Sequence, residues 1–191
     1  PNGVAVDTDG RLWVSDCDNN RVLWFNNAHS VSSNQPDADG VIGQSDFDSN
    51  NSDKDHMSYP MGLVIDDNGT LYVADAWHNR VLRFDNASSK SGSTSASADG
   101  VLGQPDLDST GAAVSRTEMD SPRGVALLDG SLFVTDRDNA RVLRFDNAAS
   151  KANGAQADGV LGQSSYTTKT QNLTRSGMQY PSRVLVDPYG R

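Results

Sequence analysis

The sequence has very little glutamate and cysteine, few basic residues and no long apolar run. Glu118 is the only glutamate among 25 acidic residues. Because aspartate favours turns and caps whereas glutamate favours helix interiors, this scarcity argues against a helical protein. No apolar stretch is long enough to cross a bilayer, so we expect no membrane span. The composition predicts many short strands joined by many turns.

The shortage of basic residues and of cysteine limits the partners and the chemistry. The chain has 16 Lys and Arg against 25 Asp and Glu, a net charge of −9, with no basic run. Such a surface repels phosphate backbones, so we expect no nucleic acid partner. Cys17 is the only cysteine, so no intrachain disulfide can form. The sequence begins inside a motif without an initiator Met, and we expect further chain upstream.

An internal repeat with a period of about 60 residues runs through the whole chain. Its copies begin at Pro1, Pro60, Pro122 and Pro181. The first reads Pro-Asn-Gly-Val-Ala-Val-Asp, then Leu-Trp-Val-Ser-Asp, then Asn-Asn-Arg-Val-Leu-Trp-Phe. The next two copies repeat all three segments in register, and the fourth stops early. Self-similarity of this kind indicates a repeat architecture rather than one irregular domain.

Each full copy predicts four short strands. In the first copy we expect strands at Gly3–Asp7, Leu12–Ser15 and Val22–Phe25, with an Asp-Gly hairpin turn after the first. A second repeated box, Ala-Asp-Gly-Val-Ile-Gly-Gln at residues 38–44, is interpreted as the outer fourth strand. Four antiparallel strands repeated radially describe a β-propeller blade.

The repeated string resembles the NHL repeat, and the Val-Leu-Gly-Gln box resembles a long-blade variant of large, often surface-exposed bacterial proteins. The resemblance implies an all-β NHL-type propeller of about three four-stranded blades plus the first strand of a fourth. The expected blades are residues 1–59, 60–121 and 122–180, followed by the single strand at 181–191. One departure is Arg183, which stands where the other copies have Gly3, Gly62 and Gly124.

Three blades do not close a ring, because propellers hide their sheet faces with 4–8 blades. The resemblance implies a six-bladed ring. We expect the remaining blades to come from the same, longer chain; the alternative is a second copy of this segment.

The most regular polar motif, Asp-x-x-Asn-x-Arg, lies between the second and third strands of each copy. A carboxylate and a guanidinium placed across a turn can pair and bind its free backbone groups. Because the motif recurs in every copy, we interpret it as structural, with His78 in place of one asparagine. Its members are Asp16, Asn19, Arg21, Asp75, Arg80, Asp136, Asn139 and Arg141.

No catalytic set is evident, and no cofactor is predicted. The pairs Asp46 and Asp48, and Asp106 and Asp108, follow the Gly-Gln box and are the candidates for a cation, with calcium possible. Related propellers include a lyase that uses histidine-bound zinc. The three histidines of this chain fall at unrelated places in their blades, without a ligand spacing.

The residues that break the repeat are the candidates for binding. They come from the turns between the second and third strands and from the positions after each proline: Met61, Trp77, His78, Arg123, Arg137 and Ser182. A mixed aromatic and charged rim suits a protein, peptide or glycan partner. We expect a non-catalytic binding or scaffold propeller in a larger extracellular, surface or periplasmic protein. The alternatives are a six-bladed lyase or hydrolase with a metal at the channel mouth, and a structural repeat of a fibre or surface assembly.

Overall fold

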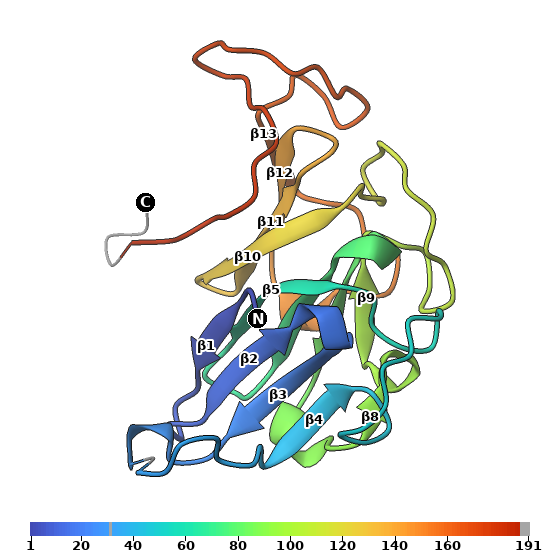
Figure 1. The fold of residues 1–191 in the computed structure, drawn as a ribbon. Coiled ribbons are helices and arrows are strands. Elements are labelled where there is room, and N and C mark those ends of the chain that lie inside the picture. The colour runs from blue at the N-terminus through green and yellow to red at the C-terminus, as the bar shows by residue number, and fades with distance from the viewer. Residues whose placement is uncertain (31, 188–191) are drawn as a thin grey trace.

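The computed structural model describes residues 1–30 and 32–187, and its architecture is all-β (Figure 1). The strands form three separate sheets, one for each full repeat. Helical structure in the described residues is limited to 3₁₀ turns of three residues each. None of the helices in the described part is long and apolar enough to cross a membrane. The fold is the predicted run of propeller blades.

Each sheet contains four consecutive antiparallel strands of its own repeat. The first blade has β1 (Val4–Val6), β2 (Leu12–Asp16), β3 (Arg21–Phe25) and β4 (Gly40–Gly43). The second has β5 (Pro60–Ile65), β6 (Leu71–Asp75), β7 (Arg80–Phe84) and β9 (Gly100–Leu102). The third has β10 (Pro122–Leu128), β11 (Ser131–Asp136), β12 (Arg141–Phe145) and β13 (Gly159–Leu161). The Val-Leu-Gly-Gln box therefore supplies the outer strand of every blade, as predicted.

The hairpin between the first two strands of a blade is held by an aspartate. In the first blade Asp7 Oδ1 accepts the backbone N–H groups of Asp9 and Arg11, at 3.0 and 2.9 Å. Gly10 has a φ of +78°, a conformation that costs glycine little. The Asp-Gly pair of the repeat thus sets the register in which β1 pairs with β2.

The inner strands β1, β5 and β10 pack directly on one another near the common axis (Figure 1). A Cβ atom on Gly3 would lie 2.6 Å from the Met61 carbonyl oxygen, and one on Gly62 would lie 2.5 Å from that of Arg123. Glycine at this place in the repeat is therefore needed for the close approach of consecutive blades, and not for a special backbone angle.

Two apolar clusters fill the spaces between the blades. Between blades 1 and 2, the fully buried Trp13 packs with Leu71 and Phe84. Between blades 2 and 3, Tyr72 packs with Leu132 and Phe145, which correspond to Leu71 and Phe84. Each blade therefore covers one face of its successor, and burial of these faces drives the stacking.

The polar segment after the third strand of a blade returns to the outer edge of the preceding blade. The two-residue strand β8 (Ser93–Thr94) pairs in parallel with β4, so the first sheet has five strands. Gly92 N donates to the Val41 carbonyl at 2.8 Å. In the next blade Val101 N donates to Asn153 Oδ1 at 3.0 Å. These contacts cover sheet edges that would otherwise expose unpaired backbone groups.

The two ends of the array differ from its middle. On the first blade Val4 and Val6 are 66% and 65% exposed, whereas Leu63 at the matching position of blade 2 is 6% exposed. Residues 181–187, predicted as the first strand of a fourth blade, lie beside β10 but form no strand ladder. The reason is that the first strand of a blade pairs with the second strand of the same blade. The described residues contain no second strand for this fourth blade. Residues 188–191 of that prediction lie outside the described part.

Candidate binding face

One end of the blades gathers the turns between the second and third strands together with the starts of the inner strands. The register places Pro60 opposite Asp75 and Pro122 opposite Asp136. The segments that enter each blade therefore lie beside the Asp-x-x-Asn-x-Arg turns. We call this end the turn face.

The repeated aspartate and arginine of each turn form an ion pair on the turn face. The Nε–Oδ2 distances are 2.8 Å for Arg21 and Asp16, 2.7 Å for Arg80 and Asp75, and 2.6 Å for Arg141 and Asp136. The side chains of the second and third pairs are 0% exposed, but those of the first are 18% and 19% exposed.

The remaining guanidinium nitrogens of Arg141 bind carbonyl groups of the long segments on either side of its blade. Nη2 donates to the backbone carbonyl oxygens of Ser115 and Glu118 at 2.8 Å each, and Nη1 donates to the backbone carbonyl of Tyr166. Arg80 makes the same kind of contacts in blade 2, with Lys54, His56 and Leu107. The motif thus fastens the loops of the turn face to the blades.

Burial acts strongly on the carboxylates beneath this face. Burial raises the pKa of Asp136, and the hydrogen bonds from Asp120 N, Asn139 and Arg141, with the guanidinium charge, act in the opposite direction. Burial and the neighbouring carboxylate of Asp138 raise the pKa of Asp120. In all of these hydrogen bonds the carboxyl oxygens of Asp136 are the acceptors. The geometry therefore suits the ionised form of Asp136, which has no proton to donate.

The glutamine of the outer-strand box also has a structural role, which the sequence analysis did not assign. Gln44 Nε2 donates to the Asn20 and Asn51 carbonyls at 2.8 Å each, and its Oε1 accepts Asn51 N. Gln104 and Gln163 repeat the two donated bonds in the other blades, and Gln163 Oε1 also accepts Thr170 N. Its recurrence in all three copies was the signal that could have revealed it.

Trp77 is the largest exposed side chain of the turn face. It is 64% exposed, whereas the other tryptophans, Trp13 and Trp24, are 0% and 4% exposed. The half-buried Tyr59 stacks on it, with ring centroids 4.7 Å apart and planes 9° apart. Tyr59 N in turn donates to Asn20 Oδ1 at 2.8 Å. Trp77 is therefore an aromatic surface whose orientation is supported from below.

A second pair of repeat-breaking residues lies on the same face. The Arg137 guanidinium lies over the ring of Tyr180, 4.7 Å from its centroid, and donates to Asp138 Oδ1 at 2.6 Å. Tyr59 and Tyr180 both directly precede the proline that starts an inner strand. We use the name aromatic patch for these two contacting pairs together, Tyr59 with Trp77 and Arg137 with Tyr180. Neither tyrosine was singled out from the sequence, although tyrosine stands before two of the prolines and Ser121 takes its place before the third.

Two predicted binding residues are buried instead. Met61 is 6% exposed and joins the core between blades 2 and 3, because the bulge between Pro60 and Leu63 lets its apolar side chain pack there. His78 is 9% exposed, and its Nδ1 lies 3.2 Å from Asp75 Oδ2. It thus takes the place that Asn139 has beside Asp136. Cys17 is also buried, and burial raises the pKa of its thiol.

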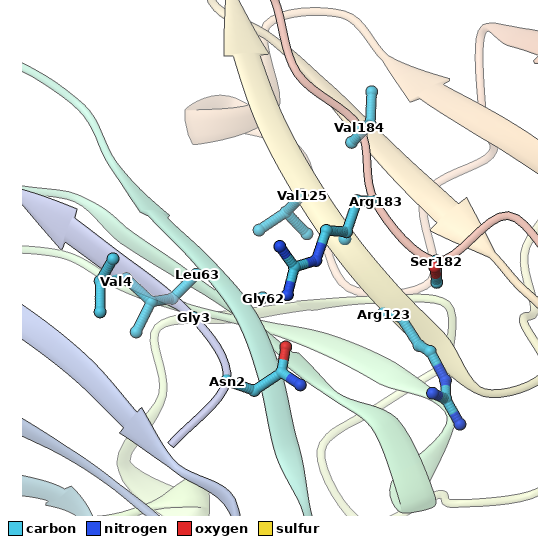
Figure 2. A pocket seen from close by; sticks show the side chains of 11 residues that line it. Asn2, Gly3, Val4, Gly62, Leu63, Arg123, Val125, Ser182, Arg183 and Val184 are labelled. Carbon is cyan, nitrogen blue, oxygen red and sulfur yellow. The ribbon is translucent and has the colours of Figure 1, made fainter.

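The other two, Arg123 and Ser182, line a cavity of about 220 Å³ between the inner strands (Figure 2). Asn2 and Arg183 also line it, and Figure 2 shows the Arg183 guanidinium pointing toward Asn2 across the opening. Arg123 points away from Asn2 in the same view. Asn2 and Arg183 were not predicted as site residues, but Arg183 had been noted as a break in the repeat.

The four aspartates considered for a cation lie in the loops that follow the outer strands. Asp46 Oδ1 accepts the backbone N–H groups of Asp48 and Ser49 within its own turn. Asp106 does the same in blade 2, and Asp108 pairs with Lys54 at 2.7 Å. Among residues 1–30 and 32–187, no three His, Cys, Asp or Glu side chains are grouped as a metal site requires. Calcium stays a prediction.

Comparison with known proteins agrees with this architecture. A family model described as NHL repeat matches residues 1–25, 57–84 and 119–145, which contain the three inner strands of each blade but not the Val-Leu-Gly-Gln box.

Solved structures with a similar fold include virginiamycin B lyase from Staphylococcus aureus, with 15% identity and a TM-score of 0.55. Hydrazine synthase from Kuenenia stuttgartiensis has 13% identity and a TM-score of 0.60. An auxiliary nutrient binding protein from Bacteroides thetaiotaomicron has 11% identity and a TM-score of 0.57. These matches cover 98–100% of this chain but only 46%, 40% and 43% of the three known chains, so the chain spans less than half their length. The three repeat matches and the three blades show that the chain contains NHL repeats and has the β-propeller fold.

Proposed function

We propose that these blades are a non-catalytic binding module that holds a protein or peptide on the turn face. The observation that carries the proposal is Trp77, a 64% exposed tryptophan supported by a stacked tyrosine. Exposed large aromatic side chains held in one orientation lose little entropy on binding and are typical centres of protein interfaces.

The composition of the aromatic patch favours a protein or peptide. Tryptophan, tyrosine and arginine are the residues most enriched among those that dominate binding energy. The patch contains all three, from two blades and from the segment before Pro181. The repeated residues beneath it are engaged with one another, as the pairs of Asp75 and Asp136 show. Binding is thus assigned to residues that differ between the blades.

The module belongs, in this proposal, to a larger extracellular, surface or periplasmic protein. Blade 1 exposes Val4 and Val6 on the face that is buried in blades 2 and 3. A face of that kind fits another NHL blade, because blade 1 itself covers the same face of blade 2. Further blades of the same protein, or of a second copy, would complete the ring.

A peptide library displayed on phage tests the binding proposal. The library is selected on the wild-type chain after depletion on a Trp77→Ala variant. The recovered peptides carry a fluorescent label and are titrated with both chains by fluorescence anisotropy, a readout that does not depend on Trp77. We expect peptides whose affinity falls at least about tenfold in Trp77→Ala, which corresponds to the loss of a central interface residue.

The control variant is Phe47→Ala, which removes another exposed aromatic side chain, 45% exposed, from the loop after β4. Peptides that bind Phe47→Ala and the wild type equally would support the proposed position of the site. Recovery of no peptide that depends on Trp77 would contradict the proposal. If oligosaccharides bind in a parallel titration and no peptide does, the ligand class is a glycan and the proposal of a peptide ligand is wrong.

A further inference from the structure

The cavity between the inner strands is lined by two cationic side chains and by no acidic one. Its lining residues include Arg123 and Arg183, whereas no aspartate or glutamate contributes to it. This is unusual in a chain with a net charge of −9. A concave site lined by one sign of charge concentrates its field and attracts ions of the opposite sign.

Neither arginine forms an ion pair with the described part of the chain. Of the fourteen ion pairs found in the described residues, none includes Arg123 or Arg183. Arg123 Nε is moreover buried without a hydrogen-bond partner. A buried donor without an acceptor is unfavourable, so an acceptor oxygen beside Arg123 Nε would be stabilising.

Arg183 stands where the repeat has glycine. Gly62 and Gly124 are needed because the backbone of the next inner strand lies within 3 Å of where a Cβ atom would be, at 2.5 and 2.8 Å. At position 183 the chain has a long arginine side chain where the other copies have glycine. Its guanidinium points toward Asn2 across the opening (Figure 2). The repeat is thus interrupted at a position from which a second cation, besides Arg123 of β10, reaches the cavity.

We propose that this cavity binds a small anion through a carboxylate or phosphate group. Arg183 would hold the group inside the cavity with help from the amide of Asn2 and the hydroxyl of Ser182. Arg123, which also lines the cavity, would add its positive charge to the field that attracts the anion. Guanidinium groups match carboxylate and phosphate oxygens with two parallel N–H donors, which gives geometric specificity as well as energy.

The part of the cavity bounded by these three blades has a volume of about 220 Å³. This volume is below the range of about 300–1,000 Å³ that is usual for sites of drug-sized ligands, and it suits a free dianion or the acidic end of a longer molecule. The site does not depend on the aromatic patch, and either proposal can fail without the other.

Isothermal titration of the full chain with inorganic phosphate and, separately, with succinate tests the anion site. The titrations are made at low ionic strength, because salt screens such contacts. We expect at least one of the two to bind at a single site, and their relative affinities distinguish phosphate from carboxylate recognition. Binding of neither overturns the proposal.

Three arginine variants locate the site. Arg183→Gln should weaken binding at least about tenfold, the loss expected for one charged hydrogen-bonding partner. Arg183→Gly, which restores the residue of the other blades, should have the same effect. Arg175→Gln is the matched control, because it removes an equal charge from an exposed loop and should leave binding unchanged.

The outcomes separate this site from the proposed peptide site. Trp77→Ala should bind the anion as the wild type does, and Arg183→Gln should keep the affinity for peptides selected on the aromatic patch. Arg183 lies outside every ladder, so its variants should retain the wild-type unfolding midpoint. If folded Arg183→Gln binds both anions as tightly as the wild type, the proposed site is wrong.

Discussion

Replacing Asp136 with alanine should destabilise the chain far more than the same change at Asp16. The two residues occupy one position of the repeat and accept the same arginine Nε donor. Asp136 and Arg141 are 0% exposed, whereas Asp16 and Arg21 are 19% and 18% exposed. The difference arises because the long segment that enters blade 3 covers its pair, with Arg141 bonded to the Ser115 and Glu118 carbonyls.

The magnitudes follow from the fate of the arginine that is left behind. Removing one partner of a buried pair typically costs about 3–5 kcal/mol, because the other charge remains buried and uncompensated. In Asp16→Ala water can reach the guanidinium of Arg21, so the loss of unfolding free energy should be about 1 kcal/mol. Since a domain of this size has a total stability of about 5–15 kcal/mol, the first change removes a large part of it.

The assay is equilibrium unfolding in guanidinium chloride, followed by circular dichroism and by tryptophan fluorescence. We expect the free energy of unfolding of Asp136→Ala to lie at least about 2 kcal/mol below that of Asp16→Ala, the difference of the two costs above. Equal losses in the two variants, or a cost below about 1 kcal/mol for Asp136→Ala, would refute the view that burial makes this pair structural.

Two further predictions concern packing and pH. Gly62→Ala should cost about 1–3 kcal/mol of unfolding free energy, because its Cβ would lie 2.5 Å from the Arg123 oxygen. Gly111→Ala, where a Cβ meets nothing within 4 Å, should stay within about 0.5 kcal/mol of the wild type in the same denaturation assay. The hydrogen bond from Lys151 lowers the pKa of Asp158 below its ordinary value of 3.8, so its contribution is present above that pH and is lost as the pH falls through the folded-state pKa. Asp158→Asn should therefore lose less stability than the wild type between pH 5 and pH 2, in thermal unfolding recorded across that range; an unchanged pH dependence would contradict the role of this pair.

The blades could be predicted from the sequence because each is specified locally and repeated. The Asp-Gly hairpin, the alternation in β2 and β3 and the outer-strand box recur at fixed spacing. Three copies in register leave few alternatives. The strand β8, by contrast, could not be predicted, because Ser93 and Thr94 lie in a polar segment and pair only through the proximity of another blade.

The candidate site was only partly predictable from the sequence. Near a bulge, packing with the neighbouring strands decides which side of the strand a side chain faces. Met61 and Arg123 both follow a proline and both lie in a bulge, yet Met61 is buried in the core and Arg123 lines the cavity. His78 was chosen as a departure from the repeat, but an imidazole nitrogen can replace the asparagine amide beside Asp75. Tyr59 was missed because its importance comes from stacking on Trp77.

The central claim is that the repeated residues hold the blades together while the residues that break the repeat bind. It is tested most directly by measuring, on one selected peptide, the affinity and the unfolding midpoint of Trp77→Ala beside those of Asp16→Ala. The account predicts that Trp77→Ala loses affinity at an unchanged midpoint, and that Asp16→Ala keeps its affinity at a lower midpoint. The opposite pattern, with affinity lost in Asp16→Ala and retained in Trp77→Ala, would contradict it.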